Sequence, residues 1–129
     1  MEHKKPFVTA FLWTILIAIA CFVSASKIPS VPLFAKDKLI HAFFYFVFTV
    51  LWFRFVSRKF HERTRIQKLM WVFLSALFYG CLIEVCQELF TQNRHADFKD
   101  VLANLTGSAL AIITIVMVER YRKAKSFNE

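Results

Sequence analysis

The residues that could do chemistry lie in three short stretches of an otherwise apolar chain. They are residues 37–45 (DKLIHAFFY), 84–88 (EVCQE) and 94–104 (RHADFKDVLAN). Histidine titrates near neutral pH, and a carboxyl group at membrane depth has a raised pKa, so both can exchange protons. Lysine and arginine bind phosphate and carboxylate groups. These residue types together predict an acid–base site that takes an anionic ligand.

Composition indicates that these stretches are held in a membrane. The chain has 129 residues, of which 57% are hydrophobic, with 16 Phe and 2 Gly. A soluble domain this short would leave too much apolar surface exposed. The formal net charge of +8 would also suit nucleic-acid binding. However, the basic residues fall between apolar runs, which favours a role in membrane topology and no nucleic-acid partner.

Four apolar runs are long enough to cross a membrane as helices, which takes about 20 residues. The spans are expected at about 7–25, 38–56, 69–90 and 98–119. The middle two reach that length once their polar ends are counted as helix. The predicted fold is all-α, a four-transmembrane-helix bundle that forms a single membrane domain over residues 1–129.

The charge of the connections predicts which way the spans face. One side of the membrane would carry 12 basic residues and the other would carry 5. The positive-inside rule makes the richer side cytoplasmic, so both termini and the 54–68 connection are expected inside. The richer set is Lys4, Lys5, Arg54, Arg58, Lys59, Arg63, Arg65, Lys68, Arg120, Arg122, Lys123 and Lys125, and the poorer set is Lys27, Lys36, Lys38, Arg94 and Lys99.

Three of the spans present polar faces at their outer ends. A helix turns by about 100° per residue, which places the polar residues of each stretch on one face. Polar side chains at one depth in a membrane can form hydrogen bonds and ion pairs with each other only if they face the interior of the bundle. We therefore expect a polar pocket in the outer half of the bundle, above Phe-rich packing. The candidate catalytic residues are His41, Glu84 and Asp100, and the candidate substrate-binding residues are Lys38, Tyr45, Gln87, Glu88, Arg94, Asp97 and Asn104.

Some of these residues also have a simpler structural interpretation. A buried polar pair can join two helices, which contributes about 0.6 kcal/mol on average. Asp97 could be a helix N-cap, and Lys38 could reach from its span to the membrane surface. His41, Glu84, Asp97 and Asp100 are suitable metal ligands by type. No His-x-x-x-His or similar spacing supports such a site, so no metal and no cofactor is predicted.

The three stretches together resemble the VanZ-like family of small bacterial membrane proteins. The pattern of that family is roughly D-K-x-x-H-x-x-x-Y, then E-x-x-Q, then R-x-x-D-x-x-D-x-x-x-N-x-x-G. The resemblance covers roughly residues 30–115, although Phe48 and Thr49 stand where relatives often have Leu-Gly. The matching residues are Asp37, Lys38, His41, Tyr45, Glu84, Gln87, Arg94, Asp97, Asp100, Asn104 and Gly107.

The resemblance implies a location in the bacterial cytoplasmic (inner) membrane and a role at the cell envelope. The namesake of the family is associated with resistance to the glycopeptide antibiotic teicoplanin. The resemblance does not imply a particular reaction. It therefore supports an outward-facing site more strongly than it supports an activity.

Two kinds of function fit these residues, and a third fits less well. The first is an envelope enzyme or lipid-modifying protein that acts on a lipid-linked cell-wall precursor or a lipid headgroup, with His41 as acid or base. The second is a protein that binds a lipid, an antibiotic tail or a partner helix without chemistry. A small transporter is disfavoured because the inner halves of the polar spans have almost no ionisable residues. The lipid bilayer is the expected partner throughout, and the apolar outer faces permit oligomers.

Overall fold

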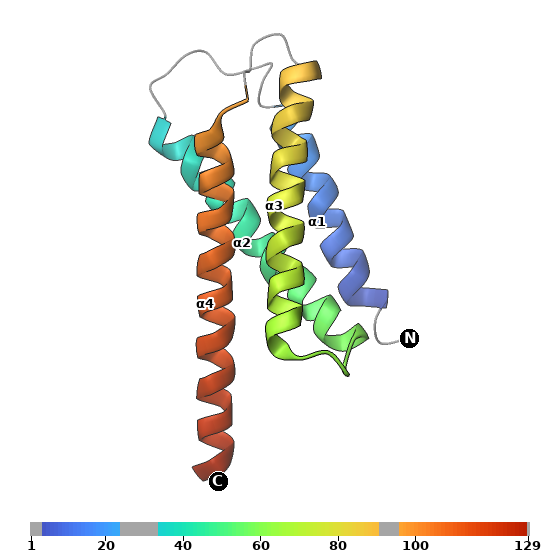
Figure 1. Cartoon of the computed structure of the whole chain (residues 1–129), viewed down its shortest axis with the longest axis vertical. Coiled ribbons are helices and arrows are strands. Elements are labelled where there is room, and N and C mark those ends of the chain that lie inside the picture. The colour runs from blue at the N-terminus through green and yellow to red at the C-terminus, as the bar shows by residue number, and fades with distance from the viewer. Residues whose placement is uncertain (1–3, 24–33, 91–95, 129) are drawn as a thin grey trace.

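The computed structural model describes residues 4–23, 34–90 and 96–128, and these residues form four long α-helices (Figure 1). The described residues include no strand, so the predicted all-α architecture is confirmed. Each helix is long and apolar enough to cross a membrane. The helices are α1 (Lys4–Val23), α2 (Phe34–Lys59), α3 (Arg65–Phe90) and α4 (Phe98–Asn128).

Each helix extends past its predicted span at one or both ends, because hydrogen bonds and not hydropathy fix where a helix ends. Residues 24 and 25 of the first predicted span lie outside the described residues. α3 begins at Arg65, about one turn before the predicted start at 69. The Gln67 N–H donates to Thr64 Oγ1 at 3.3 Å, and the Thr64 N–H donates to Gln67 Oε1 at 3.1 Å. This reciprocal pair is a capping box, which satisfies two of the donors that a helix start leaves open. At the other end of the chain, α4 continues to Asn128 through a charged, exposed segment.

Successive helices run in opposite directions, so one end of the bundle gathers the starts of α2 and α4 and the end of α3 (Figure 1). α2 crosses the bundle obliquely, from beside the start of α4 toward α1. The most extensive interface lies between α2 and α4, whereas α1 packs mainly on α2 and less on α3. The described residues of the three polar stretches all lie at this shared end.

α2 and α4 come into backbone contact at Gly107. A Cβ atom at this position would lie 1.9 Å from the carbonyl oxygen of Ala42, so a side chain does not fit there. Gly80 on α3 faces side chains instead, because a Cβ atom there would lie 3.1 Å from Asn104 Nδ2 and 3.6 Å from the Tyr45 hydroxyl oxygen. The contact at Gly107 fixes the separation of α2 and α4, and with it the separation of the polar residues that they carry.

Aromatic side chains pack below the polar end. The Phe48 ring stacks on the Tyr45 ring and on the Tyr79 ring, with ring centroids 5.7 Å and 5.6 Å apart. Stacked rings of this kind contribute beyond their buried area. This packing joins α2 to α3 beneath the polar residues.

Side-chain hydrogen bonds attach α1 to both α2 and α3. The Trp13 indole N–H donates to the Phe44 carbonyl oxygen of α2 at 3.0 Å. The Gln87 side-chain amide of α3 donates to the Cys21 carbonyl oxygen at 3.1 Å. Gln87 is 1% exposed, so this bond lies in the interior and sets the depth at which α1 meets α3.

Candidate functional site

The polar end of the bundle brings together side chains from α2, α3 and α4 that the sequence pattern singled out. Lys38, Glu88 and Asp97 lie at the edge of this group, with partly or largely exposed side chains. Arg94 lies outside the described residues. The members that are at most 6% exposed are His41, Tyr45, Glu84, Gln87, Asp100 and Asn104.

Lys38 joins α2 to the first turn of α4. Its ammonium donates to Asp97 Oδ2, 2.9 Å away, and to Asp100 Oδ1. Asp97 Oδ1 also accepts from the Lys99 N–H at 2.8 Å, so Asp97 acts as the N-cap of α4. The Lys38 ammonium, together with the Lys99 N–H, holds the pKa of the Asp97 carboxyl below its usual range. Lys38 and Asp97 therefore fix the start of α4 beside α2.

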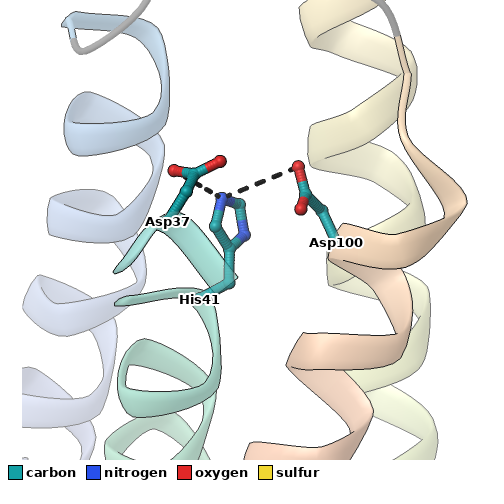
Figure 2. A group of neighbouring side chains, drawn as sticks. All are labelled: Asp37, His41 and Asp100. Atoms are coloured by element: carbon teal, nitrogen blue, oxygen red, sulfur yellow. Dashed lines mark ion pairs between the residues drawn. The ribbon is translucent and has the colours of Figure 1, made fainter. Parts of the chain in front are cut away.

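His41 lies between two carboxylates (Figure 2). Its Nε2 atom is 3.9 Å from Asp37 Oδ1 and 4.0 Å from Asp100 Oδ2. Its Nδ1 atom is 3.2 Å from Asn104 Oδ1. Asp37 precedes His41 by one turn of α2, whereas Asp100 and Asn104 come from α4. The imidazole is 4% exposed, so these neighbours on both sides of the ring set its orientation.

Tyr45 and Asn104 meet one turn deeper, opposite Gly80. The two side chains are 1% and 2% exposed. Within the described parts of the chain, neither the Tyr45 hydroxyl nor Asn104 Nδ2 has a hydrogen-bond partner. Leaving a buried polar group unpaired costs about 1–3 kcal/mol. These two groups therefore keep unused hydrogen-bonding capacity beneath His41.

The polar residues of α3 contact backbone groups. Glu84 Oε2 accepts from the Asp97 N–H at 3.1 Å, and Glu88 Oε2 accepts from the Ala96 N–H at 2.7 Å. Gln87, as described above, holds α1. The two carboxylates thus fix the chain that leads into α4. This positioning role is one that helical spacing alone does not distinguish from catalysis.

Three polar residues outside the predicted set belong to the same region. Thr49 and Ser108 are fully buried, and each follows a site residue by four positions, Tyr45 on α2 and Asn104 on α4. This spacing puts each pair on one helix face. It was the signal in the sequence that could have identified Thr49 and Ser108. Asp37 matched the family pattern but was not included among the candidate site residues.

One set of described residues has the geometry to hold a metal ion. One oxygen each from Asp37 and Asp100 and one ring nitrogen of His41 lie within 4.8 Å of one another. The set of metal ligands weighed from the sequence also contained Glu84 and Asp97. In the structure Glu84 holds the Asp97 backbone, and the Asp97 carboxylate holds Lys38. In the structure, Asp37 therefore takes the place of Glu84 and Asp97 in the candidate set of metal ligands.

Comparison with known proteins finds one protein family that matches the chain. A family model described as VanZ/LLP1 matches residues 7–119. The matched region extends from α1 into α4 and contains every residue of the site described above. No curated protein and no solved structure matches the chain.

Proposed function

The chain belongs to the VanZ/LLP1 family, and from that premise we propose that it performs acid–base chemistry on a lipid-linked component of the bacterial cell envelope. It would be a multi-pass protein of the cytoplasmic membrane that forms one membrane domain. Both termini would lie inside, as the 12 basic residues of that side favour. The end that carries His41 then faces outward, where envelope components are assembled.

The layout around His41 carries this proposal, because it suits a molecule with a polar head and an apolar tail. An apolar hollow of about 460 Å³ lies between α2 and α4. The hollow is formed by the same turns of α2 that carry Lys38 and His41. An acyl or prenyl chain would lie in the hollow with its headgroup at the polar cluster. Its lining residues are Leu39, Ile40, Ala42, Phe43, Phe46, Gly107 and Leu110.

The residues of the site take distinct roles in this proposal. His41 is the group that moves a proton, because an imidazole can both accept a proton and donate one. Asp37 and Asp100 flank its Nε2 atom and would stabilise positive charge on the ring. Asn104 fixes the other nitrogen, as the third member of a catalytic triad does. Lys38 positions Asp100, and its ammonium also attracts an anionic headgroup to the site.

A comparison of lipids in cells tests this proposal. Bacterial cells would produce the parent chain, His41→Asn or Phe78→Ala, at matched abundance in the membrane. We expect the parent and Phe78→Ala to change the amount of at least one lipid-linked envelope species, measured by mass spectrometry of lipid extracts. His41→Asn should abolish that change. Phe78 is the control because it lies on α3, outside the lining of the hollow, with a side chain that is 71% exposed.

Resistance to teicoplanin gives a second measurement in the same cells. Retention of both the lipid change and the resistance by His41→Asn would contradict acid–base chemistry and favour the second candidate function, binding without catalysis. The buried Tyr45 hydroxyl and Asn104 Nδ2, available to a ligand, are the observation that favours this second function. No difference between the parent and cells that lack the chain would contradict both functions.

A further inference from the structure

We propose that Asp37, His41 and Asp100 bind one divalent transition-metal cation of the Zn²⁺ class. The cation would lie where α2 and α4 begin, between Nε2 of the imidazole and one oxygen of each carboxylate (Figure 2). This inference goes beyond the proposed function, because the cation can bind whether or not a lipid is processed. Three arguments support it, and each rests on a different contact.

The first argument is the direction of the His41 nitrogen atoms. When Nδ1 donates to Asn104 Oδ1, 3.2 Å away, Nε2 keeps its lone pair. That lone pair faces Asp37 Oδ1 and Asp100 Oδ2, which are also acceptors. Lys38 already binds the other oxygen of Asp100, and three acceptors around one point favour a further positive charge between them.

The second argument is the size of the space between these atoms. A proton on Nε2 would draw one carboxylate into a charge-assisted hydrogen bond of about 2.7–2.9 Å. The two carboxylate oxygens instead lie at nearly equal distances from Nε2, 3.9 Å and 4.0 Å. Equal separations beyond hydrogen-bond length suit an ion that all three atoms contact.

The third argument is that two of the three ligands are already oriented by other residues. Metal-binding histidines donate their other ring N–H to a neighbour, and metal-binding carboxylates are themselves hydrogen-bonded. Asn104 provides that contact for His41. Lys38 orients Asp100 by donating a hydrogen bond to its Oδ1 atom. The Oδ2 atom of Asp100 then faces the imidazole. Both ligands are at most 6% exposed.

The ligand types and distances select the class of cation. Imidazole with carboxylates suits Zn²⁺ and its neighbours in the first transition row, whereas Mg²⁺ and Ca²⁺ prefer oxygen alone. Tetrahedral Zn²⁺ with bonds of about 2.1 Å holds its ligands about 3.4 Å apart. Each carboxylate oxygen must therefore approach Nε2 by about half an ångström, and the two oxygens, which lie within 4.8 Å of each other, must also close on one another. Asp37 is the ligand expected to move most, because its side chain is 41% exposed.

Such a site also changes the chemistry that the proposed function would use. Three protein ligands leave a fourth position of Zn²⁺ open to water or to an oxygen of a substrate. Water bound there loses a proton near neutral pH, and a phosphate oxygen bound there is polarised. The proton would then be carried by bound water and not by His41. A lipid phosphate is the headgroup chemistry that this arrangement fits.

Zinc retention by the purified full-length protein tests the site without any assay of activity. Tag-free protein in detergent would carry Cys81→Ser and Cys86→Ser, so that accessible thiols do not bind the metal. It would be stripped with a chelator, equilibrated with Zn²⁺ and freed of excess. We expect one zinc per chain by elemental mass spectrometry, and at least a tenfold weaker affinity in Asp37→Asn and in Asp100→Asn.

The control is Glu119→Gln, a carboxylate change at the other end of α4, which should retain the zinc. Asp37→Asn keeps the test decisive if Asp100→Asn fails to fold, because Asp37 is the more exposed ligand. Circular dichroism would verify that each variant is folded. The site is contradicted if the parent retains no zinc. It is equally contradicted if Asp37→Asn retains as much as the parent, which would indicate an adventitious ion only.

The two proposals fail separately. Zinc retention that depends on Asp37, with lipid profiles that do not depend on His41, would leave the cation site and remove the proposed reaction. Lipid changes that depend on His41, in a protein that retains no zinc, would remove the cation site and leave the reaction.

Discussion

Single residues set the geometry of this site through contacts with backbone as much as with side chains. His41 is held on one ring nitrogen by Asn104 and flanked on the other by two carboxylates. That arrangement depends on how closely α4 approaches α2. Gly107 sets this distance, because its α-carbon faces the backbone of Ala42. A backbone group cannot rotate away as a side chain can, so position 107 tolerates little increase in side-chain size.

Gly107→Ala should therefore destabilise the bundle and disrupt the site together. The added Cβ would lie 1.9 Å from the Ala42 carbonyl oxygen, and α4 must move away to accommodate it. Overpacking typically costs about 1–3 kcal/mol, occasionally more. We expect a lower melting temperature in detergent and, in membranes, loss of whatever lipid change the parent produces.

Thr106→Ala is the matched control for Gly107→Ala. The Thr106 side chain is exposed, and its hydroxyl donates only to the Leu102 carbonyl oxygen of its own helix among the described contacts. Its melting temperature should stay close to that of the parent. An equal loss in the two variants would mean that the contact between α2 and α4 is not what limits stability.

Among the helices, α3 organises the site without contributing a side chain to the group around His41. The carboxylates of its last turns accept hydrogen bonds from the backbone N–H groups of Ala96 and Asp97, where the chain enters α4. Lys38 then holds the same turn from the α2 side. The start of α4 is thus fixed from two helices, which is what keeps Asp100 at its distance from His41.

Glu88→Ala should loosen the entry to α4. The Ala96 N–H would lose its 2.7 Å hydrogen bond, so its hydrogen exchange should become faster. Exchange at the Asp97 N–H should change less, because Glu84 still holds it. Leu89→Ala, at a neighbouring position that is 69% exposed, is the control and should leave both rates unchanged. Unchanged exchange at Ala96 in Glu88→Ala would contradict this anchoring role.

The sequence predicted the helices and their polar faces well, because both follow from local patterns. Length and hydropathy define each helix, and spacing of three and four residues puts His41 and Tyr45 on one face. Pairing between helices was not predictable in the same way. It depends on the rotation and separation of helices, which packing at Gly107 sets. Spacing places Glu84 on the polar face of its helix, but spacing does not predict that its Oε2 atom accepts a hydrogen bond from the Asp97 backbone N–H.

The molecule as a whole has two chemically different ends. The end where α2 and α4 begin holds His41 and five carboxylates, whereas the opposite end carries Arg58, Lys59 and the basic tail of α4 (Figure 1). The five carboxylates belong to Asp37, Glu84, Glu88, Asp97 and Asp100. A membrane protein with this asymmetry is expected to keep its basic end in the cytoplasm. The apolar side chains that cover the outside of all four helices suit lipid contact between these two ends.

Labelling of single cysteines tests that orientation. In a background free of the native cysteines, Ala96→Cys should react with a membrane-impermeant maleimide in intact cells, and Glu62→Cys should react only after permeabilisation. Both positions are exposed, and they lie at opposite ends of the bundle. Equal labelling after permeabilisation is the control for reactivity. The reverse pattern in intact cells would place the His41 end in the cytoplasm and remove the outward-facing site.

The bridge from Lys38 to Asp97 has a consequence for how the protein is made. The two residues are 59 positions apart, so at about 5–20 residues per second the ribosome adds the partner roughly 3–12 seconds after Lys38. During that interval α2 cannot form the bridge that holds it to α4. The nascent chain must therefore keep Lys38 and His41 near the membrane surface or inside the insertion machinery until α4 emerges. The site is completed only when its last helix arrives, so its assembly is a late step in biogenesis.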